Sequence, residues 1–293
     1  QGATVALQGV GGFQLVVDAR NPGAVARLRQ RKQRPAKPFA LLVAELDGIA
    51  SLVEISSEEE RQLRSPAAPI VLLRRRRGQE QALAGVAPGS PCLGVMLPAS
   101  PLHLLLAEAV GGPLVATSGN RSGELLCIDA GEAQQRLAGV ADAWLLHNRA
   151  IARPLDDSLL QVVEGKPRLL RRARGYAPTA LELPQAPESR RTLLALGGDL
   201  KAAPALLQGG RLWLAPHLGD LAGARQMTWL ERGVEALLAG PQPAPEAVVA
   251  DPHPDYLSHG LARRLGLPCL TVQHHRAHGL AVAAEHGLAL PLL

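Results

Sequence analysis

Short apolar runs alternate with helical patterns along the first part of the chain, and this alternation limits the folds that it can adopt. The runs at residues 39–43, 70–73 and 114–116 are too short for buried helices. Residues 23–31 and 101–110 have the composition and capping signals of helices. Interleaved strands and helices predict a mixed α/β domain. Because aromatic residues make up only 2% of the sequence, its core must consist mainly of Leu, Val and Ala.

A stretch rich in Pro, Glu and Arg interrupts this pattern, and a new one begins after it. We predict two domains, residues 1–180 and 192–293, joined by a linker at residues 181–191. The second domain opens with a strand at residues 193–196, a Gly turn and a second strand at 205–207. This opening resembles the phosphate hairpin of actin-like ATPases.

The strand expected at residues 114–116 runs directly into Thr117, Ser118, Gly119 and Asn120. A strand that ends in hydroxyl, amide and Gly residues brings side-chain donors and unhindered backbone N–H groups to one point. Such a point can bind an anion. A polar turn without a ligand is the alternative interpretation.

A basic loop, RKQRPAKPF at residues 31–39, supplies the cations that an anion would need. It contains Lys32, Arg34 and Lys37, and two prolines favour an extended backbone. Lysine occurs at only four positions in a chain that otherwise uses Arg, so two lysines here favour point-charge contacts with phosphate. Chance composition is the alternative. We predict that this loop and the Thr117–Asn120 turn form one phosphate site.

A pair of histidines marks a second candidate site. If a helix begins near His274, then His274 and His278 lie one turn apart on the same face, the spacing of helical metal ligands. The pair follows a strand expected at residues 269–272, and sites collect at the carboxyl ends of strands in α/β folds. The alternative is a polar helix start with scattered histidines.

These segments, in this order, resemble the HypF family, the carbamoyltransferases of NiFe-hydrogenase maturation. The first half resembles its YrdC-like domain in KQRPAKPFALLV, SPAAPIVLL, LGVMLPASPLHLLL, PLVATSGNRSGE, DDSLLQVV and LLRRARGYAP. The second half resembles its Kae1-like domain in LALGGDLK, HLGDL, DPHPDYLS and VQHHRAH. The resemblance implies a YrdC-like mixed α/β domain with a twisted sheet, followed by the first part of an actin-like (Kae1/ASKHA) α/β domain.

The resemblance also implies a two-step reaction. ATP and carbamate, released from carbamoyl phosphate, give carbamoyl-adenylate, and the carbamoyl group then passes to the C-terminal cysteine of HypE as a precursor of cyanide. The implied cofactors are ATP, Mg²⁺ and a divalent metal, Zn²⁺ or Fe²⁺, at the His pair. Family members begin with acylphosphatase and zinc-finger-like domains and continue beyond the His motif, so we expect an internal fragment, with zinc-finger zinc only in the upstream part.

Site residues follow from the resemblance position by position. The implied catalytic residues are Lys32, Arg34, Lys37 and Ser118, and the implied metal ligands are His274 and His278. The implied nucleotide and carbamate contacts are Thr117, Ser118, Asn120, Arg149, Asp157, Ser158 and Arg174. For Asp157, binding Mg²⁺ and bracing a loop are both open. Gln8 stands where the family usually has Lys, which removes one potential phosphate contact.

Other features limit the remaining function classes. Three separated cysteines predict a reducing cytoplasm rather than a disulfide framework, and no apolar segment is long enough for a membrane span. A net charge of +5 permits a double-stranded RNA-binding module, although scarce aromatic residues argue against base stacking. A threonylcarbamoyl-adenylate synthase of tRNA modification is the other alternative. The run Arg74–Arg77 is either a solvated hairpin end or a nucleic-acid patch.

Overall fold

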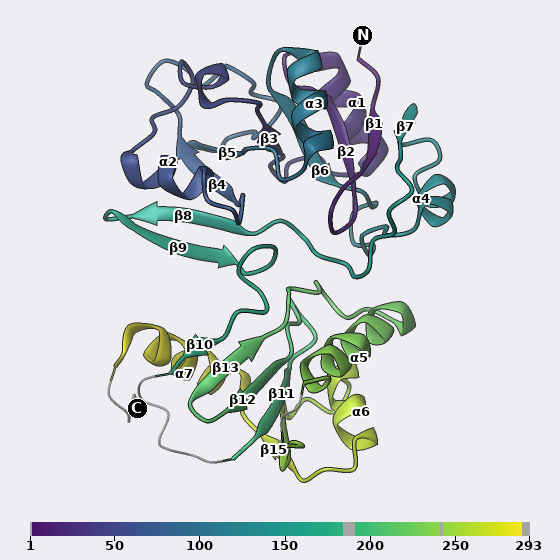
Figure 1. The fold of residues 1–293 in the computed structure, drawn as a ribbon, viewed down its shortest axis with the longest axis vertical. Coiled ribbons are helices and arrows are strands. Elements are labelled where there is room, and N and C mark those ends of the chain that lie inside the picture. The colour runs from purple at the N-terminus through teal and green to yellow at the C-terminus, as the bar shows by residue number, and fades with distance from the viewer. Residues whose placement is uncertain (1, 184–190, 241–242, 289–293) are drawn as a thin grey trace. The chain divides into compact units, whose positions relative to one another are not determined.

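The computed structural model describes residues 2–183, 191–240 and 243–288, and the chain divides into two compact units, residues 1–176 and 177–293 (Figure 1). Part of the stretch predicted as a linker is ordered in the second unit. There β10 (Leu181–Glu182) pairs with β13 (Arg211–Leu214). Residues 184–190 of the predicted linker lie outside the described residues.

The first unit is built on a mixed nine-stranded sheet, as the alternation of strands and helices predicts. Its strand order is β7-β1-β2-β6-β3-β5-β4-β8-β9. The strands are β1 (Val5–Gln8), β2 (Phe13–Asp18), β3 (Ala40–Leu42), β4 (Ile70–Arg74), β5 (Cys92–Met96), β6 (Leu114–Ser118), β7 (Ala143–Leu145), β8 (Leu159–Val163) and β9 (Lys166–Arg171).

Helices lie on both faces of this sheet: α1 (Pro22–Lys32), α2 (Ser57–Leu63), α3 (Pro101–Val110), α4 (Ala130–Arg136) and the short 3-10 helix η1 (Leu46–Gly48). The side chain of Asn21 caps α1 by accepting the N–H of Ala24, and Pro22 occupies its first turn. Helix α1 ends because Gln33 adopts the left-handed conformation, with a φ of 54°.

The two faces of the sheet carry separate apolar cores because successive strand residues point to opposite sides. On β2, Leu15 joins the core that contains Leu28 of α1, whereas Val16 joins the core that contains Ala107 of α3. Strand β6 alternates in the same way and is buried almost to its end. The packing of both cores therefore fixes where the Ser118 end of β6 lies.

The second unit contains a six-stranded sheet in the order β10-β13-β12-β11-β14-β15. The predicted opening hairpin is confirmed, because β11 (Leu193–Gly197) pairs antiparallel with β12 (Ala205–Gln208). Strands β11, β14 (Ala247–Ala250) and β15 (Cys269–Thr271) are parallel, so their carboxyl ends share one edge. The helices are α5 (Ala224–Leu238), α6 (Leu257–Arg264) and α7 (His274–His286). No helix of the described residues has the length and apolar character to cross a bilayer.

Candidate functional site

Lys32 is the last residue of α1 and is only 1% exposed. Its Nζ donates to the carbonyl oxygens of Ser118 and Asn120, at 2.5 Å each, and to Oδ1 of Asn120 at 2.8 Å. Burial, with a smaller effect from the nearby charge of Arg34, lowers the pKa of Lys32 to about 7. The structure thus brings Lys32 onto the predicted turn, where all three ammonium hydrogens have protein acceptors.

Arg34 also reaches the end of β6. Its Nη1 lies 3.4 Å from the hydroxyl oxygen of Thr117, its Nε donates to the carbonyl of Lys37 at 3.1 Å, and its Nη2 donates to the carbonyl of Pro38. The guanidinium carbon lies 5.1 Å from the ring centre of Phe39, within the range of a cation–π contact. Burial, and then the charge of Arg29, lowers the pKa of Arg34 to about 10.

Lys37 occupies a different kind of position. Its side chain is exposed, and its carbonyl oxygen makes the contacts, accepting from Arg29 at 3.1 Å as well as from Arg34. These bonds tie the backbone of the loop to the guanidinium groups of Arg29 and Arg34. Of the three predicted cations, the structure therefore brings Lys32 and Arg34 to the turn and leaves Lys37 at the surface.

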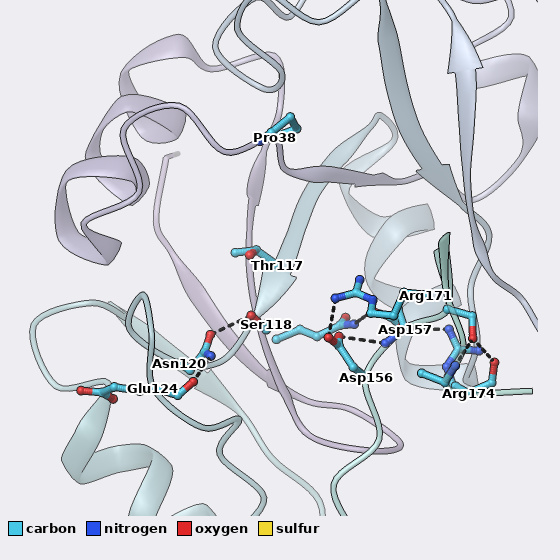
Figure 2. A network of polar contacts seen from close by, with 12 residues as sticks. Pro38, Thr117, Ser118, Asn120, Glu124, Asp156, Asp157, Arg171 and Arg174 are labelled. Carbon is cyan, nitrogen blue, oxygen red and sulfur yellow. Dashed lines mark hydrogen bonds and ion pairs between the residues drawn. The ribbon is translucent and has the colours of Figure 1, made fainter. Parts of the chain in front are cut away.

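The turn itself is a closed hydrogen-bond network (Figure 2). The hydroxyl of Ser118 donates to Oδ1 of Asn120 at 2.7 Å, and Nδ2 of Asn120 donates to the carbonyl of Glu124 at 2.6 Å. Thr117 is buried beside it. The Ser118 hydroxyl and one Nδ2 hydrogen of Asn120 thus have protein acceptors, and an anion at this turn would compete with them.

Gly119 closes this turn and leaves no space for a side chain. A Cβ at this position would lie 2.5 Å from Cβ of Phe13 and 2.7 Å from the carbonyl oxygen of Phe13. We expect Gly119→Ala to lower the free energy of unfolding of the first unit by ~1–3 kcal/mol through overpacking, measured by urea denaturation. Gly48→Ala is the control, because its Cβ would meet nothing within 4 Å. Equal midpoints for the two variants would contradict this expectation.

A second cluster of charges lies beside the turn, where Asp156 and Asp157 face Arg171 and Arg174 (Figure 2). Arg171 donates to Oδ2 of Asp156 at 2.5 Å, and Arg174 donates to Oδ1 of Asp157 at 2.7 Å. Arg174 also donates to the carbonyls of residues 67 and 68. Of the residues predicted here, Asp157 and Arg174 are thus paired with each other.

Ser158 has a structural position. It is fully buried, and its hydroxyl donates to the carbonyl of Arg174 at 2.9 Å and accepts the N–H of Ala173 at 2.8 Å. It joins the start of β8 to the end of the first unit.

The other oxygen of Asp157 belongs to a chain of hydrogen bonds that the sequence did not predict. Nε2 of Gln14 donates to Oδ2 of Asp157 at 2.8 Å, so Oε1 of Gln14 must accept from Nε2–H of His103 at 2.9 Å. Nδ1 of His103 then accepts from the hydroxyl of Ser100 at 2.9 Å. Burial lowers the pKa of His103, which is only 4% exposed, so the neutral ring is favoured, and the two hydrogen bonds select its Nε2–H tautomer.

Three members of this hydrogen-bond chain, Gln14, His103 and Asp157, line a hollow of about 20 Å³, together with Ser118, Arg174 and the Gly9–Gly12 turn. The volume accommodates about one water-sized group. The hollow joins the two halves of the candidate site, because Ser118 comes from the Lys32 network and Asp157 from the arginine cluster. In the sequence, this hydrogen-bond chain is indicated only by Ser100, which lies three residues before His103 at the start of a helix.

Gln14→Leu should interrupt this chain of hydrogen bonds at its central residue. The variant leaves Nε2–H of His103 and one oxygen of Asp157 without a partner, which costs ~1–3 kcal/mol for each buried group. We expect a lower urea midpoint and, by ¹⁵N NMR, loss of the single Nε2–H tautomer of His103. Gln30→Leu, on the exposed face of α1, is the matched control. A parent spectrum that shows the Nδ1–H tautomer of His103 would rule out the assigned tautomer, and equal urea midpoints for Gln14→Leu and Gln30→Leu would contradict the expected cost.

Arg149 lies on an exposed loop that Gln8 holds in place. Nε2 of Gln8 donates to the carbonyl of Arg149 at 2.9 Å, and its Oε1 accepts the N–H of His147 at 3.2 Å. Gln8 is buried, so its side-chain amide forms hydrogen bonds with this loop and not with solvent. The structure does not bring the Arg149 side chain into a hydrogen bond with the other predicted residues.

The His pair lies at the start of α7, on one helix face as predicted. Nε2 of His278 is 3.1 Å from Nε2 of His274, and Nδ1 of His274 is 3.0 Å from Oδ2 of Asp251. Two nitrogens bound to one tetrahedral Zn²⁺ lie about 3.3 Å apart, given Zn–N bonds of ~2.0–2.1 Å. The two imidazoles therefore fit a shared divalent metal. The described residues contain no group of three or more His, Cys, Asp or Glu arranged for a metal.

Asp251 is the residue that the sequence did not single out at this site. It follows β14 directly, is 8% exposed, and its Oδ1 accepts the N–H of His253 at 2.9 Å. A carboxylate on Nδ1 of His274 leaves the Nε2 lone pair for a metal. The parallel neighbours β14 and β15 explain the juxtaposition, since their carboxyl ends lie side by side.

Comparisons with known proteins agree with this arrangement in both units. The Sua5/YciO/YrdC family model, described as telomere recombination, matches residues 1–173, and the model of the HypF Kae1-like domain matches residues 188–285. The chain is 45% identical over 287 residues to carbamoyltransferase HypF of Synechocystis sp. and 47% identical over 296 residues to that of Rhodobacter capsulatus.

A solved structure of full-length HypF in its phosphate- and nucleotide-bound form is similar, with a TM-score of 0.89 and 40% identity. That match covers 99% of this chain and 45% of the solved chain. The two relatives are matched over 98% and 97% of this chain but only 37% and 38% of their own length. The chain thus spans a little over a third of the curated relatives that it matches.

Proposed function

Because this chain belongs to the HypF family, with a Sua5/YciO/YrdC-type domain ahead of a HypF Kae1-like region, we propose that it is the carbamoyl-transferring part of such an enzyme. The observation that carries the proposal is the convergence of Lys32 and Arg34 on the Thr117–Asn120 turn. Two cations beside a turn rich in hydroxyl and amide groups suit the phosphates of ATP.

In the first step, water hydrolyses carbamoyl phosphate to carbamate and inorganic phosphate, and an oxygen of the carbamate then attacks the α-phosphorus of ATP. A new carbamate O–P bond forms, the bond to the β-phosphate oxygen breaks, and pyrophosphate leaves with the electron pair. Arg34 neutralises negative charge on the phosphates, and the exposed Lys37 adds a further positive charge. Lys32 holds the Thr117–Asn120 turn in its orientation. Mg²⁺ bound with ATP supplies further neutralisation.

The contacts of Asp157 favour a bracing role over a magnesium ligand. Its two oxygens accept from Arg174 at 2.7 Å and from Gln14 at 2.8 Å. Binding a metal there would bring a second cation close to the Arg174 guanidinium. Asp157 therefore holds Arg174 and Gln14 in place beside the hollow.

In the second step, a thiolate takes over the carbamoyl group. The family implies HypE as the acceptor: its C-terminal cysteine sulfur forms the C–S bond while the bond to AMP breaks. His274 and His278 would hold Zn²⁺ or Fe²⁺, which as a Lewis acid polarises the carbamoyl carbonyl. Asp251 keeps His274 in the tautomer that this requires.

The direct test is exchange of labelled pyrophosphate into ATP that depends on carbamoyl phosphate. We expect exchange with carbamoyl phosphate, none with threonine plus bicarbonate, and a loss of about 100-fold in Arg34→Gln. Arg76→Gln, an exposed arginine outside the site, is the control. Exchange that depends on threonine would instead support a threonylcarbamoyl-adenylate synthase and overturn the proposal.

A further inference from the structure

The four-arginine run is a second concentration of positive charge in the first unit, separate from the Lys32 site. Arg74 ends β4, and Arg75, Arg76 and Arg77 follow in the connection to β5. No ion pair within 4.0 Å joins any of the four to a carboxylate of the described residues. Arg76 turns away, because its Nε donates to the carbonyl of Ala50 at 2.8 Å.

Arg75 is unusual among them, because its guanidinium is buried and only 6% of the residue is exposed. Its Nε donates to the carbonyl of Ser90 at 3.2 Å, and its Nη1 donates to the carbonyls of Ala82 at 2.5 Å and Gln79 at 3.4 Å. Its Nη2 is buried without a hydrogen-bond partner among the described residues. A buried donor without an acceptor is costly unless a ligand supplies one, and the nearest carboxylate charge, that of Glu80, makes no ion pair within 4.0 Å of Arg75.

A cavity of about 790 Å³ lies against these arginines, within the size range of small-molecule sites. Arg74, Arg75 and Arg77 line it, and Ser90 and Gln81 add polar groups. Two carboxylates, Glu54 and Glu80, line it as well, so the lining keeps one net positive charge. It shares no residue with the hollow beside Ser118.

We propose that this cavity binds a small anion that carries one or more phosphate groups. Three guanidinium groups around one cavity match the geometry of phosphate oxygens, which accept bidentate bonds from Arg. A bound phosphate would give the unused Nη2 donor of Arg75 an acceptor and add negative charge to a lining that has one net positive charge. The carboxylates and the absence of aromatic residues from the lining argue against an extended nucleic-acid strand.

Isothermal titration of the whole chain with inorganic pyrophosphate tests the site. We expect two binding sites, one at Lys32 and Arg34 and one at the four-arginine run. Arg74→Gln with Arg77→Gln, both exposed, should weaken one site about tenfold or more and leave the other. Arg34→Gln should have the complementary effect. Arg76→Gln with Arg232→Gln, which removes equal charge away from the cavity, is the control.

A gain of binding provides a second test that does not depend on losing a contact. Glu54→Gln removes a carboxylate from the lining of the cavity. The arginine site of this variant should bind pyrophosphate about threefold more tightly or more, because a negative charge that repels the anion is lost. The proposal is overturned if Arg74→Gln with Arg77→Gln binds pyrophosphate as the control does. It is also overturned if Arg34→Gln abolishes all pyrophosphate binding, or if the double variant loses only binding to an RNA duplex.

Discussion

Lys32→Met is expected to reduce carbamoyl-phosphate-dependent pyrophosphate exchange by about 10³-fold and to destabilise the first unit by ~2–4 kcal/mol. Both effects have one cause. The ammonium of Lys32 satisfies the carbonyls of Ser118 and Asn120 and the amide oxygen of Asn120. Without it, buried acceptors lose their donor, and the Thr117–Asn120 turn loses its orientation. Exchange kinetics and urea denaturation measure the two effects.

Lys37→Met is the matched control, because it removes the same charge from the same loop. Lys37 is exposed, so its replacement should change the free energy of unfolding by less than about 0.5 kcal/mol. Exchange should fall less than in Lys32→Met. If Lys32→Met kept activity within a few-fold of the parent chain, the turn would not depend on this ammonium and the site would have to be placed elsewhere.

The pH dependence of stability distinguishes a buried lysine from a solvated one. The pKa of Lys32 is lowered from 10.5 to about 7, so between these values the unfolded chain binds a proton that the folded chain does not. The free energy of unfolding should therefore rise with pH across this window, by up to about 1.4 kcal/mol per unit. Lys32→Met should lose this rise. Activity that needs the ammonium should decline as the pH passes 7.

The positions of most strands, and the proximity of Lys32 and Arg34 to the end of β6, could be predicted from local patterns. Strand β6 is an apolar run that ends in small polar residues, and the basic loop precedes another apolar strand. The burial of Lys32 could not be predicted, because it depends on where α1 ends. The helix continues through Lys32 and stops at Gln33, so the lysine points from the helix end toward β6 rather than from a loop into solvent.

The hydrogen-bond chain that links Ser100, His103, Gln14 and Asp157 shows what local patterns cannot predict. Its members come from β2, from α3 and from the loop before β8, and only the packing of both sheet faces brings them together. A single polar residue on a strand, such as Gln14, does not by itself indicate a functional contact. The His pair of α7 was predictable because its spacing is local, but its carboxylate partner Asp251 lies 23 residues away, directly after β14.

His278→Ala is expected to weaken the binding of Zn²⁺ or Co²⁺ to the second unit by more than about 100-fold, because it removes one of two protein nitrogens that converge within 3.1 Å. Competition with a chromophoric chelator measures the affinity, and the visible spectrum of Co²⁺ reports imidazole coordination independently of activity. Asp251→Asn should cost ~10–100-fold, because it disturbs only the orientation of His274.

His275→Ala is the control for this series, since His275 is an exposed neighbour on the same helix and lies outside the pair. The expected order of metal affinity is His275→Ala, then Asp251→Asn, then His278→Ala. This order follows from geometry alone: a bystander, a residue that orients a ligand, and a ligand. If His275→Ala weakened binding as much as His278→Ala, the helix face would be wrongly assigned. Equal affinity in all three variants would show that the metal binds elsewhere in the chain.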